Sequence, residues 1–314
     1  MIGPRALRRL GVLGMNERNA RYILQHNPRA FYPNVDDKIR TKELLNRRDI
    51  PTPRVHAIIE RVHDFRAVLT RPDFPADFVL KPARGAEGRG ILVITGKEDG
   101  VWLKAGGERL TLEAIEYHAV NILAGLYSLG GDDDRVIIEY RVKSDPVFAP
   151  VAFRGVPDVR LILYRGIPVM SMLRLPTKAS DGKANLHQGS VGVGIDMATG
   201  ITRGGVCKNR LIDRHPDTMK PVAGIQVPRW HELLDIAVRI YPVFRLGYLG
   251  IDFVLDQTLG PLVLELNARP GLSIQIANAK GLLPRLEAVD RWLLPPCPDH
   301  SRQVRLAFAQ QLEK

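Results

Sequence analysis

Apolar residues recur along the chain in two patterns, which together predict a mixture of helices and short strands. Helical spacing of apolar residues favours helices in four stretches, at residues 1–35, 36–48, 111–127 and 229–245. Short apolar runs favour buried strands at residues 78–83, 90–95, 135–142, 159–165, 167–175, 248–256 and 261–267. Because short turns join several neighbouring strands, the pattern predicts an α/β (α+β) chain that contains hairpins.

Two segments carry further local signals. Asp36 and Asp37 open the helix predicted over 36–48, because Asp oxygens accept the amide hydrogens left unpaired at a helix N-terminus. The two prolines of Ile50-Pro51-Thr52-Pro53 end that helix in an extended segment. Residues 176–205 are rich in Gly, Ser and Asn and lack periodicity, which predicts a long irregular loop. Loops of this length are often functional.

Length and composition narrow the class of protein. The 314 residues suit one large domain or two lobes that share a cleft, and 45% hydrophobic with 25% charged residues is ordinary for a globular chain. No apolar run approaches the roughly 18 residues of a membrane helix, and we interpret the basic start as neither a signal peptide nor an anchor. Cys207 and Cys297 are too few for a disulfide framework, which favours a reducing, cytoplasmic setting.

The formal net charge of +11 raises the question of an anionic partner. The lysines and arginines are scattered rather than clustered, apart from short runs such as Arg5 to Arg9. We therefore interpret the charge as a solvated basic surface. No recognition motif accompanies it, which argues against nucleic acid as the main partner.

The strongest chemical signal lies in the two strands predicted near the C-terminus. Strands direct alternate side chains to one face, so Glu265 and Asn267 share a face, and Asp252 lies on the paired strand within reach. Two carboxylates and an amide oxygen are hard ligands suited to magnesium. A half-exposed hairpin with simple alternation would give the same pattern without a metal.

Other candidate residues are weaker when taken singly. Lys81 ends an apolar strand beside a turn that carries Gly85, Gly88 and Gly90, and glycines let backbone amides approach phosphates. A glycine-rich hairpin turn is the structural alternative. The remaining candidates are polar residues in or after apolar strands: Glu139, Arg160, Arg174, Asn185 and His187. Fixed cations near a phosphate can stabilise an anionic transition state, although a solvated strand arginine or a structural histidine would look the same.

The order of these motifs resembles the ATP-grasp superfamily. Its pattern is a helix beginning with Asp-Lys, a strand ending in Lys-Pro, a glycine loop, a strand with a hinge Glu, and a late Asp…Glu-x-Asn. The matching residues are Asp37-Lys38, Lys81-Pro82, Ala83 to Gly90, Glu139, and Asp252…Glu265-Leu266-Asn267. The match spans roughly residues 36–275, and five motifs in order are more specific than any one.

Within the superfamily the chain most resembles the RimK-type alpha-L-glutamate ligases. The residues that carry this resemblance are Asp158-Val-Arg160, Arg174, Asn185-Leu186-His187, and Glu265 to Leu272. The segment GMNERNARYILQHNPRAFYPNVDDK, residues 14–38, resembles the subgroup called alpha-L-glutamate ligase-like proteins.

The resemblance implies a role for each set of residues. Residues expected to hold ATP are Lys38 and Lys81 at the phosphates, Gly85, Gly88 and Gly90 in the closing loop, and Glu139, Tyr140 and Val142 at the adenine hinge. Residues expected to bind Mg²⁺, with Mn²⁺ as a substitute, are Asp252, Glu265 and Asn267. Arg174, helped by Arg160, would stabilise the acyl phosphate and the tetrahedral intermediate, while Asn185 and His187 would orient substrate.

The resemblance also implies an ATP-grasp fold, in which two α+β lobes clasp ATP, with a truncated N-terminal region. The expected domains are a short helical segment (1–35), an N-terminal lobe with the glycine-rich loop (36–142), a C-terminal lobe with the metal site (143–295) and a tail (296–314). The expected enzyme is an ATP-dependent carboxylate–amine ligase that works through an acyl phosphate. Its partners would be ATP, an amino acid, glutamate-like by resemblance, and a carboxylate-bearing peptide, protein or small molecule, with no membrane.

Departures from the RimK pattern leave alternatives open. RimK-type ligases carry a separate α/β domain before the Asp-Lys helix, where this sequence has 35 residues. Gln188 stands where those ligases tend to have Arg, and Arg269 replaces a small residue. An ATP-grasp phosphotransferase and a non-catalytic nucleotide-binding partner protein therefore stay as alternatives. A homo-oligomer that completes the cleft also stays open.

Overall fold

A computed structural model describes residues 4–85, 88–128, 130–294 and 301–313 of the chain. Two residues of the predicted glycine loop, Ala86 and Glu87, and Cys297 lie outside these ranges. The chain divides into two compact units. Unit 1 comprises Met1–Asp36, Glu43–Pro51 and Lys143–Lys314, and unit 2 comprises Asp37–Lys42 and Thr52–Val142. None of the helices within the described ranges has the length and hydropathy that crossing a membrane requires.

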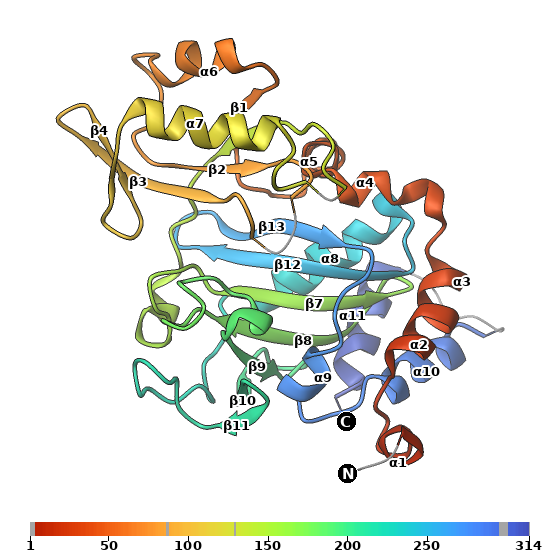
Figure 1. Cartoon of the computed structure of the whole chain (residues 1–314). Helices are drawn as coiled ribbons and strands as arrows, with labels where there is room; N and C mark the ends of the chain where they lie inside the picture. The colour runs from red at the N-terminus through yellow and green to blue at the C-terminus, as the bar shows by residue number, and fades with distance from the viewer. Residues whose placement is uncertain (1–3, 86–87, 129, 295–300, 314) are drawn as a thin grey trace. The chain divides into compact units, whose positions relative to one another are not determined.

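Unit 2 is an antiparallel six-stranded sheet with the strand order β1-β6-β2-β3-β4-β5. The strands are β1 (Val55–Ile59), β2 (Phe78–Pro82), β3 (Leu92–Glu98), β4 (Val101–Lys104), β5 (Arg109–Leu110) and β6 (Val136–Glu139). Helices α6 (Val62–Leu69) and α7 (Leu112–Leu123) lie along one side of this sheet (Figure 1). Phe65 of α6, Ile115 of α7 and Phe78 of β2 belong to one buried core, which covers the apolar face of the sheet.

The helix predicted over 36–48 is confirmed over Lys38–Asn46 with Asp37 at its start, whereas Asp36, the other residue of the predicted opening pair, ends the preceding helix Pro33–Asp36. Helix α5 (Lys38–Asn46) begins directly after Asp37, whose Oδ1 accepts hydrogen bonds from the amides of Ile39 (2.9 Å) and Arg40 (3.3 Å). Helix α7 begins in the same way, because the Thr111 hydroxyl accepts from the Ala114 amide at 3.3 Å. Short polar side chains at these positions satisfy amides that have no partner inside the helix.

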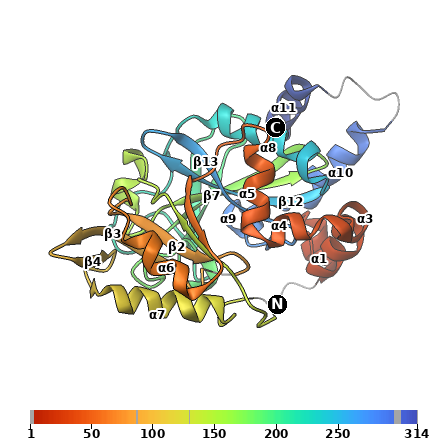
Figure 2. The same ribbon diagram turned by 90° about the horizontal axis from the view of Figure 1, so that it is seen from above.

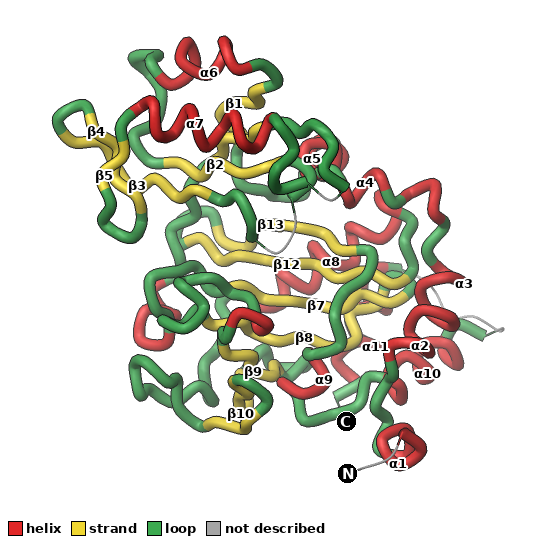
Figure 3. The backbone as a smooth tube through the Cα atoms, viewed as in Figure 1, coloured by secondary structure: helices red, strands yellow, loops and turns green. Residues whose placement is uncertain are grey.

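Unit 1 contains an antiparallel seven-stranded sheet with the order β11-β10-β9-β8-β7-β12-β13 (Figure 3). The strands are β7 (Asp158–Tyr164), β8 (Ile167–Leu175), β9 (Val191–Ile195), β10 (Thr202–Cys207), β11 (Arg210–Ile212), β12 (Tyr248–Asp256) and β13 (Gly260–Asn267). Its other elements are α1 (Pro4–Arg9), α2 (Met15–Glu17), η1 (Arg18–Ile23), α3 (Leu24–His26), η2 (Arg29–Phe31), α4 (Pro33–Asp36), η3 (Pro146–Val151), η4 (Leu186–Gln188), α8 (Trp230–Phe244), α9 (Ile274–Ala277), α10 (Leu283–Trp292) and α11 (Arg302–Gln311). The two hairpins predicted at 159–175 and 248–267 are confirmed.

Helices cover both faces of this sheet. Odd-numbered residues of β7, such as Leu161, pack with α8 in one core, and even-numbered residues, such as Ile162, belong to a second core. The second core includes residues of α9, α10 and the N-terminal helices, and Figure 2 shows α8 well apart from α1 and α3. We call the face of Ile162 the site face, because the polar residues described below project from it.

The irregular loop predicted over 176–205 is wrong, since β9 and the start of β10 lie within it. Valine alternates with glycine in β9, so the sequence shows little hydrophobic contrast. The glycines are required by close packing. A Cβ on Gly194 would lie 2.7 Å from the Ala277 carbonyl oxygen, so the end of α9 rests directly on the strand backbone.

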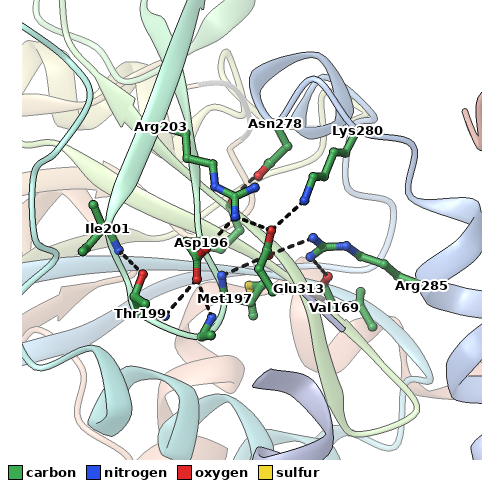
Figure 4. A network of polar contacts seen from close by, with 12 residues as sticks. Val169, Asp196, Met197, Thr199, Ile201, Arg203, Asn278, Lys280, Arg285 and Glu313 are labelled. Carbon is green, nitrogen blue, oxygen red and sulfur yellow. Dashed lines mark hydrogen bonds and ion pairs between the residues drawn. The ribbon is translucent and has the colours of Figure 1, made fainter. Parts of the chain in front are cut away.

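One buried carboxylate anchors the end of the described chain (Figure 4). Glu313 pairs with Arg203 (2.7 Å), Lys280 (2.9 Å) and Arg285 (2.8 Å). Burial opposes ionisation of Glu313, yet these cations outweigh it and lower the pKa of the carboxyl. Because α11 directly precedes Glu313, the ion pairs fix this helix against the sheet.

We expect Glu313→Gln to lower the free energy of unfolding by about 3 kcal/mol, because it leaves the 7% exposed Arg285 side chain without its charged partner. The matched control is Asp235→Asn. It removes an exposed ion pair between α8 and Arg302 of the same α11, and we expect a loss of no more than about 1 kcal/mol. Urea unfolding measures both values, and equal losses would contradict the anchoring role of Glu313.

Candidate active site

The register of β7, β8 and β12 places four charged side chains on the site face. Asp158 lies opposite Arg174 of β8, and Arg160 lies opposite Asp252 of β12. Asp158 and Arg160 are two residues apart on one strand, so all four side chains project in the same direction. We call these four residues the charge cluster.

The charge cluster is held by paired hydrogen bonds. The Arg174 guanidinium donates to both oxygens of Asp158, at 2.5 and 2.7 Å, and to Asp252 Oδ2 at 2.8 Å. The Arg160 guanidinium donates to both oxygens of Asp252. Each arginine therefore grips a carboxylate with two parallel bonds, the strongest geometry for this pair. Arg174 joins the two carboxylates into one network.

The two buried carboxylates have pKa shifts of opposite direction. Burial raises the pKa of Asp158 to about 6, and the Asp252 charge adds to this rise, because together they outweigh the attraction of Arg174 and Arg160. Burial acts on Asp252 in the same direction, but two arginines outweigh it and lower the pKa of that carboxyl. Asp252 is therefore held as a carboxylate near neutral pH. For Arg174, burial is outweighed by both carboxylates, so its pKa is raised.

The three residues predicted as metal ligands lie at the edge of this cluster. Asp252 and Glu265 are direct partners across β12 and β13, and Asn267 is two residues further along. Leu264 forms a bulge next to Glu265, because Phe253 pairs with Val263. The side-chain oxygen of Asn267 accepts a hydrogen bond from the Arg269 amide at 2.8 Å. The loop after β13 therefore sets the orientation of this amide.

These donors fit a hard divalent cation. Carboxylate and amide oxygens are the ligands that magnesium prefers alongside phosphate oxygens. In the described part of the chain no three His, Cys, Asp or Glu side chains form a metal-binding group, and the predicted set contains only two carboxylates. A cation at Asp252 must share its carboxylate with the two arginines.

Glycine at position 250 makes room for the loop beside the predicted metal ligands. Gly250 is the register partner of Asn267. A Cβ at Gly250 would lie 2.7 Å from Pro270 and 3.6 Å from the Arg160 side chain. Pro270 therefore packs on the backbone of β12, next to both Asn267 and Arg160.

Asn185 and His187 lie one strand further along the same face. Gly192 of β9 is the register partner of Arg174, and a Cβ there would lie 2.9 Å from the Leu186 side chain. The turn η4 that contains Leu186 therefore covers the site face beside Arg174. Asn185 accepts from the His187 amide at 3.0 Å, and the His187 side chain is exposed. Neither residue joins the ion pairs of the charge cluster.

Unit 2 holds a second buried ionic group. Glu139 of β6 pairs with Lys81 of β2 at 2.5 Å and with Lys42 of α5 at 3.0 Å, and all three side chains are at most 5% exposed. Burial opposes ionisation of Glu139, yet the two ammonium groups outweigh it and lower the pKa of the carboxyl. The group has one more cation than anion, which suits a polyanionic ligand such as a phosphate chain.

Lys38 and the glycine turn meet at the N-terminus of α5. The Lys38 ammonium donates to the Gly85 carbonyl at 2.5 Å, and its backbone amide donates to the Ala83 carbonyl at 3.0 Å. Gly88 and Gly90 have φ values of 73° and 71°, a region that favours glycine. His118 Nε2 lies 2.9 Å from the Gly90 carbonyl oxygen. The described part of the turn is thus fixed at both ends.

Tyr140 and Val142, predicted for the adenine hinge, follow β6. The strand predicted over 135–142 is shorter than expected, because β6 ends at Glu139. The Tyr140 amide donates to the Arg54 carbonyl at 2.8 Å, and Val142 is buried. Because residues 140–142 lie outside the strand, their backbone groups are not needed for strand pairing.

Sequence reasoning gave no role to two residues of these clusters. Lys42 lies one helical turn after Lys38, and a Lys-x-x-x-Lys spacing on α5 was the available signal. Asp158 precedes Arg160 by two residues, so strand alternation already placed it on the same face as the arginine. Asp158 carried part of the family resemblance, but the ion pairs of both residues were seen only when their partners in β6 and β8 were known.

A family model described as "Sugar-transfer associated ATP-grasp" matches residues 17–291. The chain therefore belongs to this family of ATP-grasp proteins, and this family match confirms the predicted ATP-grasp fold. No match was found among curated proteins.

Solved structures with a similar fold include three ligases of low identity. The ATP-grasp ligase PsnB, complexed with a minimal precursor, is 16% identical with a TM-score of 0.44; the match covers 85% of this chain and 63% of PsnB. D-cycloserine synthetase DcsG is 15% identical with a TM-score of 0.47, over 85% of this chain and 73% of DcsG. D-alanine–D-alanine ligase from Bacillus anthracis is 14% identical with a TM-score of 0.42, over 90% of this chain and 69% of that ligase. PsnB has also been solved with Mg and ADP.

The buried lysine in unit 2 gives a pH-dependent prediction. Burial lowers the pKa of Lys42 to about 8 despite the attraction of Glu139. The folded protein thus releases this proton at lower pH than the unfolded chain, so the Lys42 contribution to the free energy of unfolding rises from about pH 8 to 10.5, the ordinary pKa. We expect the stability of wild type relative to Lys42→Met to increase over this range.

Denaturant unfolding at several pH values measures this difference. Lys183→Met, at an exposed lysine, is the matched control and should show no such trend relative to wild type. A constant difference between wild type and Lys42→Met across the range would contradict the buried ionic group.

Proposed function

We propose that the chain is an ATP-dependent carboxylate–amine ligase with RimK-like chemistry. The observation that carries this proposal is the shared face of β7, β8, β12 and β13. On that face two arginines, each with a side chain that is 12% exposed, adjoin two carboxylates and an amide with the donor chemistry of a magnesium site. Membership of an ATP-grasp family supports ATP as the source of energy. A cytoplasmic location is part of the same proposal.

We assign ATP to the lysine-rich group of unit 2. Lys38 and Lys81 hold the phosphates, and we add Lys42, which shares Glu139 with Lys81. The glycines of the turn, Gly85, Gly88 and Gly90, approach the phosphates through their amides. Glu139, Tyr140 and Val142 line the adenine. This assignment follows the ATP-grasp pattern residue by residue.

We assign magnesium, with Mn²⁺ as a substitute, to Asp252, Glu265 and Asn267. An ion held by these three residues would supply positive charge to the phosphate oxygens. The two bonds from Arg174 to Asp158 do not involve the proposed ligands, so Asp158 would keep the Arg174 guanidinium in place beside the ion.

The reaction runs in two steps. A substrate carboxylate oxygen attacks the γ-phosphorus, the bond from that phosphorus to the ADP oxygen breaks, and an acyl phosphate forms. An amine then attacks the acyl carbon, loses a proton and expels phosphate. Positioning and charge neutralisation dominate such a transfer. Arg174, helped by Arg160, stabilises the developing anions, and Asn185 and His187 orient the substrate.

The substrate class stays broad in this proposal. By RimK resemblance the amine is an amino acid such as glutamate, and the carboxylate belongs to a peptide, protein or small acid. The family description adds sugar transfer, so acidic and amino sugars belong among the candidates. An oligomeric partner is not required by the chemistry.

ADP release tests the proposed reaction. Purified protein with ATP and magnesium is incubated with pools of amino acids, acidic peptides and sugar acids, and products are identified by mass spectrometry. We expect one combination to give ADP and an amide, and Glu265→Ala to abolish both. A phosphorylated product without an amide would replace the ligase by the phosphotransferase. No turnover together with tight ATP binding would favour the non-catalytic alternative.

Replacing Arg174 tests its part in the chemical step. We expect Arg174→Lys to lower kcat by roughly 100-fold with little change in the KM for ATP, because lysine lacks the planar fork that grips two anions. Arg203→Lys is the matched control, on β10 of the same sheet but in the Glu313 group. Equal effects of the two variants on kcat would contradict a catalytic role for Arg174.

A further inference from the structure

The N-terminal helical segment contacts both strands that carry the predicted metal ligands. Residues Met15–His26 form one continuous helical run, α2, η1 and α3, whose middle section Arg18–Ile23 is a π-helix. The wider turn of a π-helix is uncommon and often marks a functional site. Here this section places Arg18, Tyr22 and Ile23 in the buried layer on the site face.

Asn27, directly after this run, joins the two strands with one side chain. Its amide nitrogen donates to the Tyr248 carbonyl (2.7 Å) and the Ala268 carbonyl (3.1 Å), and its oxygen accepts from the Tyr248 amide (2.8 Å). The residue is 2% exposed, so each bond is protected from water. Tyr248 begins β12, and Ala268 directly follows the predicted ligand Asn267.

Arg18 fixes the next part of the same loop. Its guanidinium donates to the Pro270 carbonyl at 2.7 Å, and the residue is only 8% exposed. Asn19 accepts two further bonds from this guanidinium, at 3.0 and 2.8 Å, which holds the arginine in one orientation. Together, Arg18 and Asn27 therefore hold the backbone at Ala268 and Pro270.

A glycine directly before β12 leaves room for this N-terminal segment. The Gly247 amide donates to the His26 carbonyl at 2.8 Å, and a Cβ at Gly247 would lie 2.6 Å from the His26 Cβ. A side chain at this position would push the segment away. Gly247 and Gly250 thus admit the N-terminal segment and Pro270, respectively, against β12.

We propose that Arg18 and Asn27 are positioning residues for the metal ligand Asn267. This inference rests on the magnesium assignment of the proposed function. The connection runs through one backbone amide: Arg18 and Asn27 hold the carbonyls on both sides of Arg269, and the Arg269 amide holds the Asn267 side-chain oxygen at 2.8 Å. Groups that orient a ligand in this way often change metal affinity by 10- to 100-fold.

Binding measurements test this without turnover. Calorimetric titration with ATP, at a series of Mn²⁺ concentrations and in metal-free buffer with chelator, gives the metal dependence of nucleotide affinity. For Asn27→Ala we expect the Mn²⁺ concentration needed for half of the effect to rise roughly 10-fold. The affinity for ATP in chelator should equal that of wild type. Arg18→Met, which keeps the apolar stem but loses the bond to Pro270, should shift the dependence in the same direction.

Gln275→Ala is the matched control for a general loosening of the segment. Gln275 is also buried and binds the same N-terminal region, through bonds of 2.8 and 3.1 Å to the backbone of Leu13. Its third bond is to the Leu282 amide and not to residues 268–270. We expect a loss of thermal stability with a wild-type Mn²⁺ dependence.

The outcomes distinguish the positioning role of Arg18 and Asn27 from the magnesium assignment itself. If Asn27→Ala and Arg18→Met lose stability but keep the wild-type Mn²⁺ dependence, the positioning role is overturned and the magnesium assignment stands. An equal shift in Gln275→Ala overturns the positioning role as well, because any loosening would then suffice. If wild type itself binds ATP without any dependence on metal, both the assignment and the inference are overturned.

Discussion

The antiparallel register of β8, β7, β12 and β13 is the constraint on which the rest of unit 1 depends. Paired residues project to the same face, so pairing Arg174 with Asp158 and Arg160 with Asp252 brings all four charges together. A shift of one residue in either pairing would turn a charged row into the α8 core. The register is therefore fixed twice, by burial on one face and by ion pairs on the other.

The site face combines two environments along single strands. On β7, Ile162 and Tyr164 belong to a core, whereas Asp158 and Arg160 belong to the charge cluster. Core packing holds the apolar end of the strand in place. Because the charged residues lie on the same strand, this packing also restrains the backbone that carries them. Each cluster carboxylate is satisfied by arginine before any ligand arrives, which avoids the cost of an isolated buried charge. Two arginines and two aspartates make the charge cluster neutral as a whole, so a cation bound at Asp252 would lie beside a neutral network.

Local patterns predicted the helix start at Asp37 and the pairing of Asp252 with Glu265, because alternation and capping depend on neighbouring residues. They did not predict β9, where the contrast between valine and glycine is weak and the packing partner, α9, lies some eighty residues later. Lys42 was missed, and Asp158 was left without a role, for a related reason, since each has its ion-pair partner on a different element of the fold. The ligand roles themselves come from resemblance and stay proposals.

The contacts of Asn27 also have a consequence for the order of folding. Its partners Tyr248 and Ala268 lie 221 and 241 residues later in the chain. During synthesis the N-terminal segment therefore lacks these neighbours until residues 248–268 have been made. Residues 52–142, the larger part of unit 2, are contiguous and close shorter loops. The β12–β13 hairpin, together with the bonds that Asn27 makes to it, is thus among the last parts of the molecule to be completed.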